Sequence, residues 1–206
     1  MNLHILKASD RLNPFEQEIR GAFEFALAQI EERLKLPSVD VIVVDNPDAA
    51  IPETGVGGFA PTAHLIYMSV DPNHSDLKNN IATETKSTVA HELHHCARWQ
   101  AVGYGKTLLE AIVSEGLADH FDLEINGGQP KPWSIAVQGE VLAKLKERAR
   151  ADYHNQNYNH WAWFFGSDDI PRWAAYSLGF QIVKEYLQKT GKSAAKLVGE
   201  DAKAFV

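Results

Sequence analysis

The sequence predicts an α+β fold in which a small N-terminal sheet is followed by a mainly helical C-terminal part. β-Branched, extended segments occur between residues 39 and 72, whereas helical patterns dominate from residue 75 onwards. Strands that come first and helices that follow are typical of α+β domains. The chain of 206 residues suits one domain. We therefore expect a single domain over 1–206, with an α/β lobe over about 1–103 and a helical lobe over about 104–206.

The first helix is predicted to begin near Asn13. Asn13 is a candidate cap, Pro14 suits the first turn, and Glu16 occupies the capping-box position. Apolar residues then follow helical spacing and predict one buried face: Ile19, Ala22, Phe23, Ala26, Ile30 and Leu34.

Extended structure is predicted for Val39–Pro47 and for two segments within Gly55–Pro72, which a turn at Pro61 separates. The neighbouring glycines at 57 and 58 allow another backbone to approach closely. Gly58, Phe59 and Ala60 are therefore candidates for an edge strand on which a peptide substrate adds by main-chain pairing. The alternative is a mobile turn.

A long helix is predicted from about Ser75 to Ala101, and a second begins after a capping box formed by Thr107 and Glu110. A further helix is expected near Val137–Arg150. The last helix opens at Pro171 and closes at Gly191, and the aromatic segment 153–169 before it is expected to be irregular.

Charge and hydropathy exclude several classes of function. The net charge of −7, with no basic run, argues against nucleic acid as a partner. No stretch approaches eighteen apolar residues, so no membrane span is expected. The N-terminus does not resemble a secretory signal, and one cysteine cannot form an internal disulfide, so we expect a cytoplasmic protein. The sequence leaves the oligomeric state open.

The motif His91-Glu-Leu-His-His95 carries the chemistry. Histidines four residues apart lie about 40° apart around a helix, so both imidazoles can reach one ion. Glu92 lies aside from this pair and is placed to act as a general base on water. This arrangement is typical of a catalytic zinc site, and we expect one zinc ion per chain.

A third ligand is expected because two histidines alone hold zinc weakly. Glu115, twenty residues after His95 on the next predicted helix, is the candidate. Asp119, one turn further, is expected to accept a hydrogen bond from the outer nitrogen of a ligand histidine. Cys96 is expected to be a buried packing residue rather than a nucleophile.

The segments "HELHH" and "SEGLAD" resemble the gluzincin zinc metalloproteases, the thermolysin-like group. Together with "IPRWAAYSLGFQIVKEYL", they are also similar to a bacterial family described as predicted Zn-dependent proteases, over roughly residues 57–187. The resemblance implies a zincin-like fold with an edge strand beside the His-Glu-x-x-His helix. It also implies a Tyr or His donor to the transition-state oxyanion, for which Tyr176 is the first candidate and His160 and His154 are alternatives.

The function predicted is a zinc-dependent peptidase in which a zinc-bound water, activated by Glu92, attacks the peptide bonds of peptides or unfolded proteins. Two alternatives remain open: a zinc-binding regulatory or partner-binding protein without turnover, and a metalloamidase acting on non-peptide amides. Three other polar residues are assigned no catalytic role. His94 is expected to be solvent-exposed or to line the cleft, His120 to lie on the surface, and Arg98 to be solvated.

Overall fold

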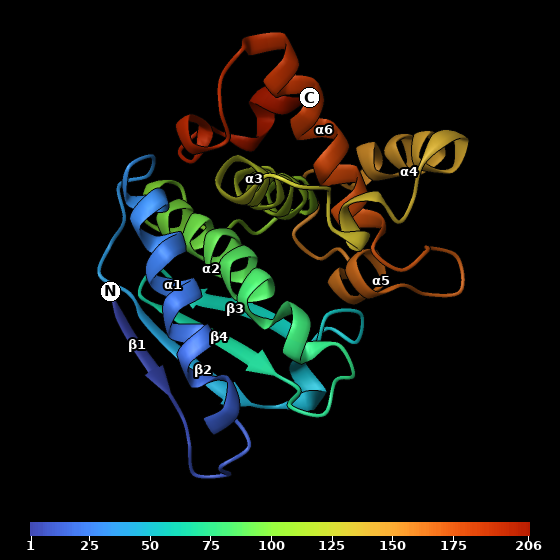
Figure 1. Cartoon of the computed structure of the whole chain (residues 1–206). Coiled ribbons are helices and arrows are strands. Elements are labelled where there is room, and N and C mark those ends of the chain that lie inside the picture. The colour runs from blue at the N-terminus through green and yellow to red at the C-terminus, as the bar shows by residue number, and fades with distance from the viewer. The chain divides into compact units, whose positions relative to one another are not determined.

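The computed structural model describes residues 1–206 and consists of two compact units, Met1–Gln100 and Ala101–Val206 (Figure 1). The strands all belong to the N-terminal unit, and the C-terminal unit is helical. The fold is therefore α+β, with a small sheet and mostly helical content, as the sequence predicts. No helix combines the length and the hydropathy that a membrane crossing needs.

The N-terminal unit contains a four-stranded sheet in the order β1-β2-β4-β3. Strand β1 (Asn2–Ile5) pairs in parallel with β2 (Asp40–Asp45), and β2 pairs in parallel with β4 (Leu65–Val70). Strand β3 (Val56–Thr62) pairs with β4 in the antiparallel direction and has no strand on its other side. The edge strand that the sequence predicts is thus β3.

Helices α1 (Glu16–Glu31) and α2 (Leu77–Ala101) cover one face of this sheet (Figure 1). Ile19 of α1 and Ile81 of α2 pack in the same buried cluster as Met68 of β4. This packing removes the apolar face of each element from water, which is the main force that holds the layers together. All six residues of the predicted first-helix face are buried: Ile19, Ala22, Phe23, Ala26, Ile30 and Leu34.

The start of α1 differs from its prediction. Asn13 lies in a 3₁₀ turn, η1 (Asn13–Phe15), and its side-chain amide donates to Asp10 Oδ1 at 2.9 Å. The α-helix begins only after this turn and has no side-chain cap. The Glu16 carboxylate accepts hydrogen bonds from Lys7 and Arg20, so the predicted capping box is absent.

The turn predicted at Pro61 is also displaced. Pro61 belongs to β3, where the register shifts between Phe59 and Thr62, and the turn falls at residues 63–64. Proline cannot donate a ladder hydrogen bond, but an edge strand tolerates it at such an irregularity. Strand β1 was not expected, because four residues at the N-terminus give too short a pattern to identify.

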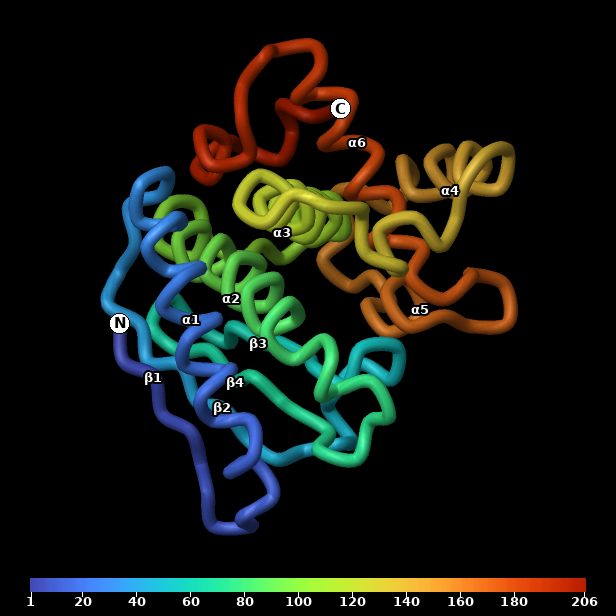
Figure 2. Tube along the Cα trace, in the orientation of Figure 1, coloured from blue at the N-terminus to red at the C-terminus, as the bar shows by residue number.

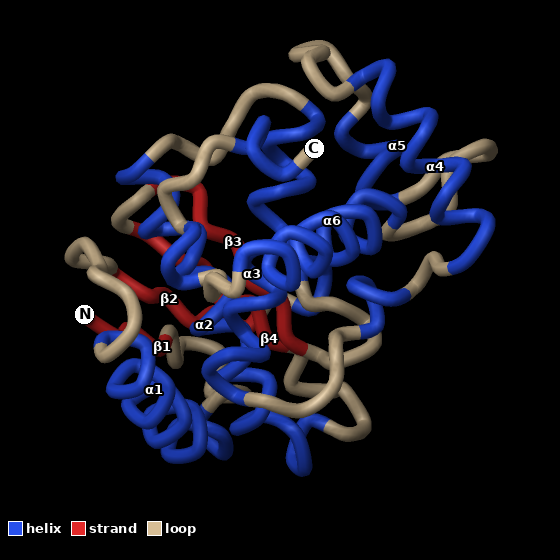
Figure 3. Tube along the Cα trace, turned by 90° about the horizontal axis from the view of Figure 1, so that it is seen from above, coloured by secondary structure: helices blue, strands red, loops and turns tan.

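The C-terminal unit consists of four α-helices and three 3₁₀ turns (Figure 3). The helices are α3 (Leu108–Asn126), α4 (Gly139–Asp152), α5 (His160–Phe165) and α6 (Ala174–Thr190). The turns are η3 (Pro132–Ile135), η4 (Ala195–Leu197) and η5 (Ala202–Phe205). Figure 2 shows the chain after α6 folding back, so that η5 packs against α3.

Some of the helix boundaries predicted for this unit are confirmed, and others differ in the structure. The capping box of Thr107 and Glu110 is present, and Gly191 closes α6 in the left-handed conformation. The segment 153–169 is not wholly irregular, because it contains α5, whose first turn the Asn159 side chain caps. Helix α6 begins three residues after Pro171, at Ala174.

Helices α3 and α6 cross at two glycines. A Cβ atom on Gly116 would lie 2.2 Å from the carbonyl oxygen of Gly179, and one on Gly179 would lie 2.2 Å from the carbonyl oxygen of Ile112. The two backbones therefore touch directly, and neither position has room for a side chain. Tyr176 lies one turn before Gly179 on α6, and Glu115 directly precedes Gly116 on α3. Both residues therefore lie near this crossing.

Candidate metal centre

His91 and His95 lie one turn apart on α2 with their imidazoles converging. Their Nε2 atoms are 3.0 Å apart, and the ring planes meet at 79°. Two nitrogens bound to one tetrahedral zinc at about 2.0–2.1 Å would be separated by about 3.3 Å, which is close to this spacing. The pair therefore fits two ligands of a single ion.

Glu92 of α2 is buried beneath the edge strand. Its side chain is 6% exposed, and it lies against the backbone of Gly58 in β3. A Cβ atom built on Gly58 would lie 2.4 Å from Glu92 Oε1 and 2.8 Å from Cδ. Glycine at this position thus leaves the space that the carboxylate occupies.

For the zinc peptidase that the sequence predicts, Gly58→Ala should reduce turnover by about 100-fold without loss of the metal. The added methyl group would displace the end of the flexible Glu92 side chain, and a misplacement of about 1 Å in a reacting group can cost this much. The measurement is kcat on a peptide substrate, with metal content determined on the same sample. Gly21→Ala is the matched control, because nothing lies within 4 Å of a Cβ at Gly21. Equal turnover in both variants would show that Gly58 does not control the position of Glu92.

Strand β3 presents part of its backbone to its open edge. The Asp71 amide donates to the Gly55 carbonyl at 2.8 Å, so Gly57 and Phe59 continue the hydrogen-bonded pairs with β4. By alternation, the N–H and C=O groups of Gly58 point away from β4, and the pattern is interrupted beyond Phe59, where the register shifts. The Ala60 carbonyl accepts from Trp99 Nε1 at 3.1 Å, which attaches the strand to α2.

Phe59 differs from its two neighbours. Its side chain is 62% exposed and pairs across the ladder with Tyr67. Gly58 faces Glu92 and Ala60 is buried, so alternation places the Phe59 ring on the opposite face of the sheet. The role of Phe59 as a substrate-binding residue stays a prediction.

Glu115 lies on α3 and is 5% exposed. Its Oε1 atom accepts a short hydrogen bond from the Tyr104 hydroxyl, which comes from the segment before α3. Sequence reasoning missed Tyr104. The sequence shows only a tyrosine between two glycines immediately before a capping box, and this pattern is also typical of an ordinary loop between two helices.

Asp119, one turn after Glu115, is 3% exposed and joins α3 to η3. It accepts hydrogen bonds from Trp133 Nε1 at 3.1 Å and from Ser134 Oγ at 2.6 Å. A carboxylate offers about four lone-pair sites, so these two bonds leave capacity for a further donor. Its predicted bond to a ligand histidine stays a prediction.

The candidates for the oxyanion donor differ in their surroundings. Tyr176 is half-buried, and its ring packs edge-to-face on Phe164 at 5.1 Å between centroids. His160 bonds through Nδ1 to the Tyr158 hydroxyl at 2.8 Å, and His154 is exposed. Sequence reasoning did not single out Tyr158.

The charge of the Glu115 carboxylate affects the pKa of both Tyr158 and His160. Burial, with smaller effects from the Glu115 and Glu110 carboxylates, raises the pKa of Tyr158 to about 12. Burial lowers the pKa of His160, and the Glu115 charge opposes this change in part. At neutral pH the tyrosine is therefore a protonated donor.

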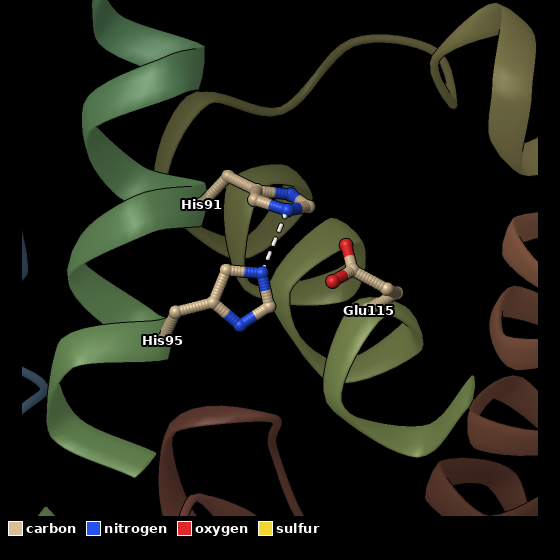
Figure 4. A group of neighbouring side chains, drawn as sticks. All are labelled: His91, His95 and Glu115. Atoms are coloured by element: carbon tan, nitrogen blue, oxygen red, sulfur yellow. Dashed lines mark hydrogen bonds between the residues drawn. The ribbon is translucent and has the colours of Figure 1, made fainter. Parts of the chain in front are cut away.

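Three candidate ligand residues come together in one group. Ligand atoms of His91, His95 and Glu115 all lie within 4.8 Å of one another. Figure 4 shows both imidazoles and the carboxylate turned toward one another. Two imidazole nitrogens and a carboxylate oxygen are the donors that catalytic zinc sites use.

Three other polar residues depart from their predicted positions. His94 is fully buried and Arg98 is 2% exposed, so neither is solvated. His120 is partly buried, stacks on the Phe180 ring and bonds to the Phe180 carbonyl at 2.9 Å.

Cys96 is buried as predicted, and its thiol contacts the Thr62 carbonyl at 3.6 Å. Burial, with a smaller effect from the Glu92 carboxylate, raises the pKa of this thiol to about 12. A thiol this hard to ionise is not a nucleophile.

These features define a protein with a possible metal site built from two histidines and a glutamate. The chain belongs to the family described as "Predicted Zn-dependent protease (DUF2268)", whose pattern matches residues 19–206. It is also 31% identical over 125 residues to the uncharacterized protein YjaZ of Bacillus subtilis (strain 168). That alignment covers 57% of this chain and 48% of YjaZ, so the chain spans about half the length of this relative. No solved structure gives a significant match.

Proposed function

We propose that the protein is a zinc-dependent peptidase of the gluzincin type, with a zincin-like fold and peptides or unfolded proteins as substrates. The observation that carries the proposal is the grouping of His91, His95 and Glu115 within 4.8 Å. The family description, which names a zinc-dependent protease, supports the same reading. In this proposal the three residues hold one zinc ion.

When bound, zinc would polarise the substrate carbonyl and make water easier to deprotonate. Glu92, buried beside the histidines on α2, takes the proton from the attacking water and returns it to the leaving amine. The low exposure of Glu92 strengthens its electrostatic interactions, because bulk water does not screen them. Asp119 holds a ligand histidine in the correct tautomer.

The substrate would extend β3 at its open edge. Gly58 offers its backbone N–H and C=O groups there, whereas the Ala60 carbonyl is already bonded to Trp99 Nε1. The absence of a side chain on Gly58 lets the peptide pass close to Glu92. Tyr176 is the proposed donor to the oxyanion, with His160 and His154 as the alternatives. The bonded pair of Tyr158 and His160 gives His160 a fixed orientation that His154 lacks.

The test begins with protein purified without added metal or a histidine tag, on which elemental analysis measures zinc per chain. We expect about one equivalent. The same sample is then incubated with a peptide library, and mass spectrometry identifies internal cleavage. Absence of zinc even after zinc is supplied would refute the proposal. Zinc without any hydrolysis would favour a binding protein, and hydrolysis confined to non-peptide amides would favour an amidase.

A further inference from the structure

We propose that Tyr104 is a positioning residue that holds the Glu115 carboxylate in place for the metal. The Tyr104 hydroxyl donates to Glu115 Oε1, and the two residues lie eleven positions apart. Glu115 is buried, whereas Tyr104 is half-buried in the segment that leads into α3. The inference rests on the proposed function, in which Glu115 is a zinc ligand.

The segment around Tyr104 has a backbone that only glycine adopts easily. Gly103 has φ +83° and Gly105 has φ +113°, both in the left-handed range. A Cβ atom at Gly105 would also lie 2.3 Å from the Cβ of Glu110. The two glycines therefore allow the tight path on which Tyr104 meets Glu115.

The chain after Tyr104 is attached to α3 itself. The backbone amides of Lys106 and Thr107 donate to Glu110 Oε2 at 2.8 and 2.9 Å, and the Thr107 hydroxyl donates to the same atom at 2.9 Å. Glu110 and Glu115 belong to one helix, so these bonds attach the segment that carries Tyr104 to the helix that carries the ligand. These bonds thus hold the Tyr104 segment close to Glu115.

A neutral hydroxyl suits this task. Glutamate has three rotatable side-chain bonds, and each must be ordered before the carboxylate can bind a metal well. A lysine or arginine would order it but would also cancel the charge that attracts the cation. A tyrosine hydroxyl orients the group and leaves its negative charge, as the outer partners of metal ligands commonly do.

The test is Tyr104→Phe, with zinc affinity measured by competition against a chromogenic chelator. We expect the zinc dissociation constant to rise by about 10- to 100-fold, the range found when such outer partners are removed. Tyr153→Phe is the matched control. Tyr153 is a buried tyrosine of the same unit, and its hydroxyl has no hydrogen-bond partner. Its removal should leave zinc affinity unchanged.

A double variant separates positioning from a general loss of structure. In the background of Glu115→Ala, Tyr104→Phe should have no further effect on zinc affinity, because the group that it positions is absent. A lower melting temperature of the metal-free protein with unchanged zinc affinity would mean a structural role and would overturn the inference. If the wild-type chain binds no zinc, the proposed function itself fails. If it binds zinc and Tyr104→Phe binds equally well, only this inference fails.

Discussion

Replacing Glu92 by glutamine should leave one zinc ion bound and reduce turnover by about 10²- to 10⁴-fold, the range that a general base contributes. Glutamine keeps the shape of the side chain under Gly58 but cannot take a proton. His91 and His95 are untouched, so the metal should be retained. Among the substitutions considered, this one should have the largest effect on catalysis.

The measurement combines kcat on an internally cleaved peptide with elemental analysis of the same preparation. Glu24→Gln is a suitable control, because Glu24 is an exposed glutamate on α1, far along the chain from the histidines. Its turnover should equal that of the wild type. Hydrolysis that survives in Glu92→Gln would show that another group is the base.

Glu115→Ala should weaken zinc binding by at least about 100-fold, more than the loss of an outer partner costs. Two histidines alone would remain, and a catalytic zinc site needs three protein ligands. The variant also leaves the Tyr104 hydroxyl without its acceptor, which should destabilise the metal-free protein by about 1–3 kcal/mol.

Competition with a chelator measures the affinity, and thermal unfolding of the metal-free protein measures the stability. Glu140→Ala is the control, because Glu140 is 81% exposed on α4 and forms only a surface ion pair with Lys144. A surface pair of this kind contributes little to stability. Zinc affinity that stays unchanged in Glu115→Ala would remove Glu115 from the set of ligands.

The sequence predicts those features that depend on local spacing. Histidines at positions i and i+4 converge on any helix, so the geometry of His91 and His95 follows once α2 is recognised. The capping box at Thr107 is likewise a local signal, and the structure contains it. The choice of Glu115 has no such local basis, because Glu115 lies on another helix, twenty residues after His95.

Features that depend on tertiary packing were missed or wrong. Arg98 was expected to be solvated and His94 to be solvent-exposed or to line the cleft, but both residues are buried on α2. Tyr104 lies in a loop without periodicity, and its role emerges only when the chain folds back on α3. Asn13 has the sequence of a helix cap, yet its neighbours form a 3₁₀ turn that shifts the helix start.

The enclosure of α3 has a consequence for motion. Between Leu108 and Phe121, every residue except Glu110 and His120 is buried, and the direct contact of Gly116 with Gly179 leaves no gap for sliding. Backbone amides in such a segment exchange their hydrogens with solvent only when the surrounding unit opens as a whole. We therefore expect the backbone around Glu115 to be among the slowest in the C-terminal unit to exchange its amide hydrogens.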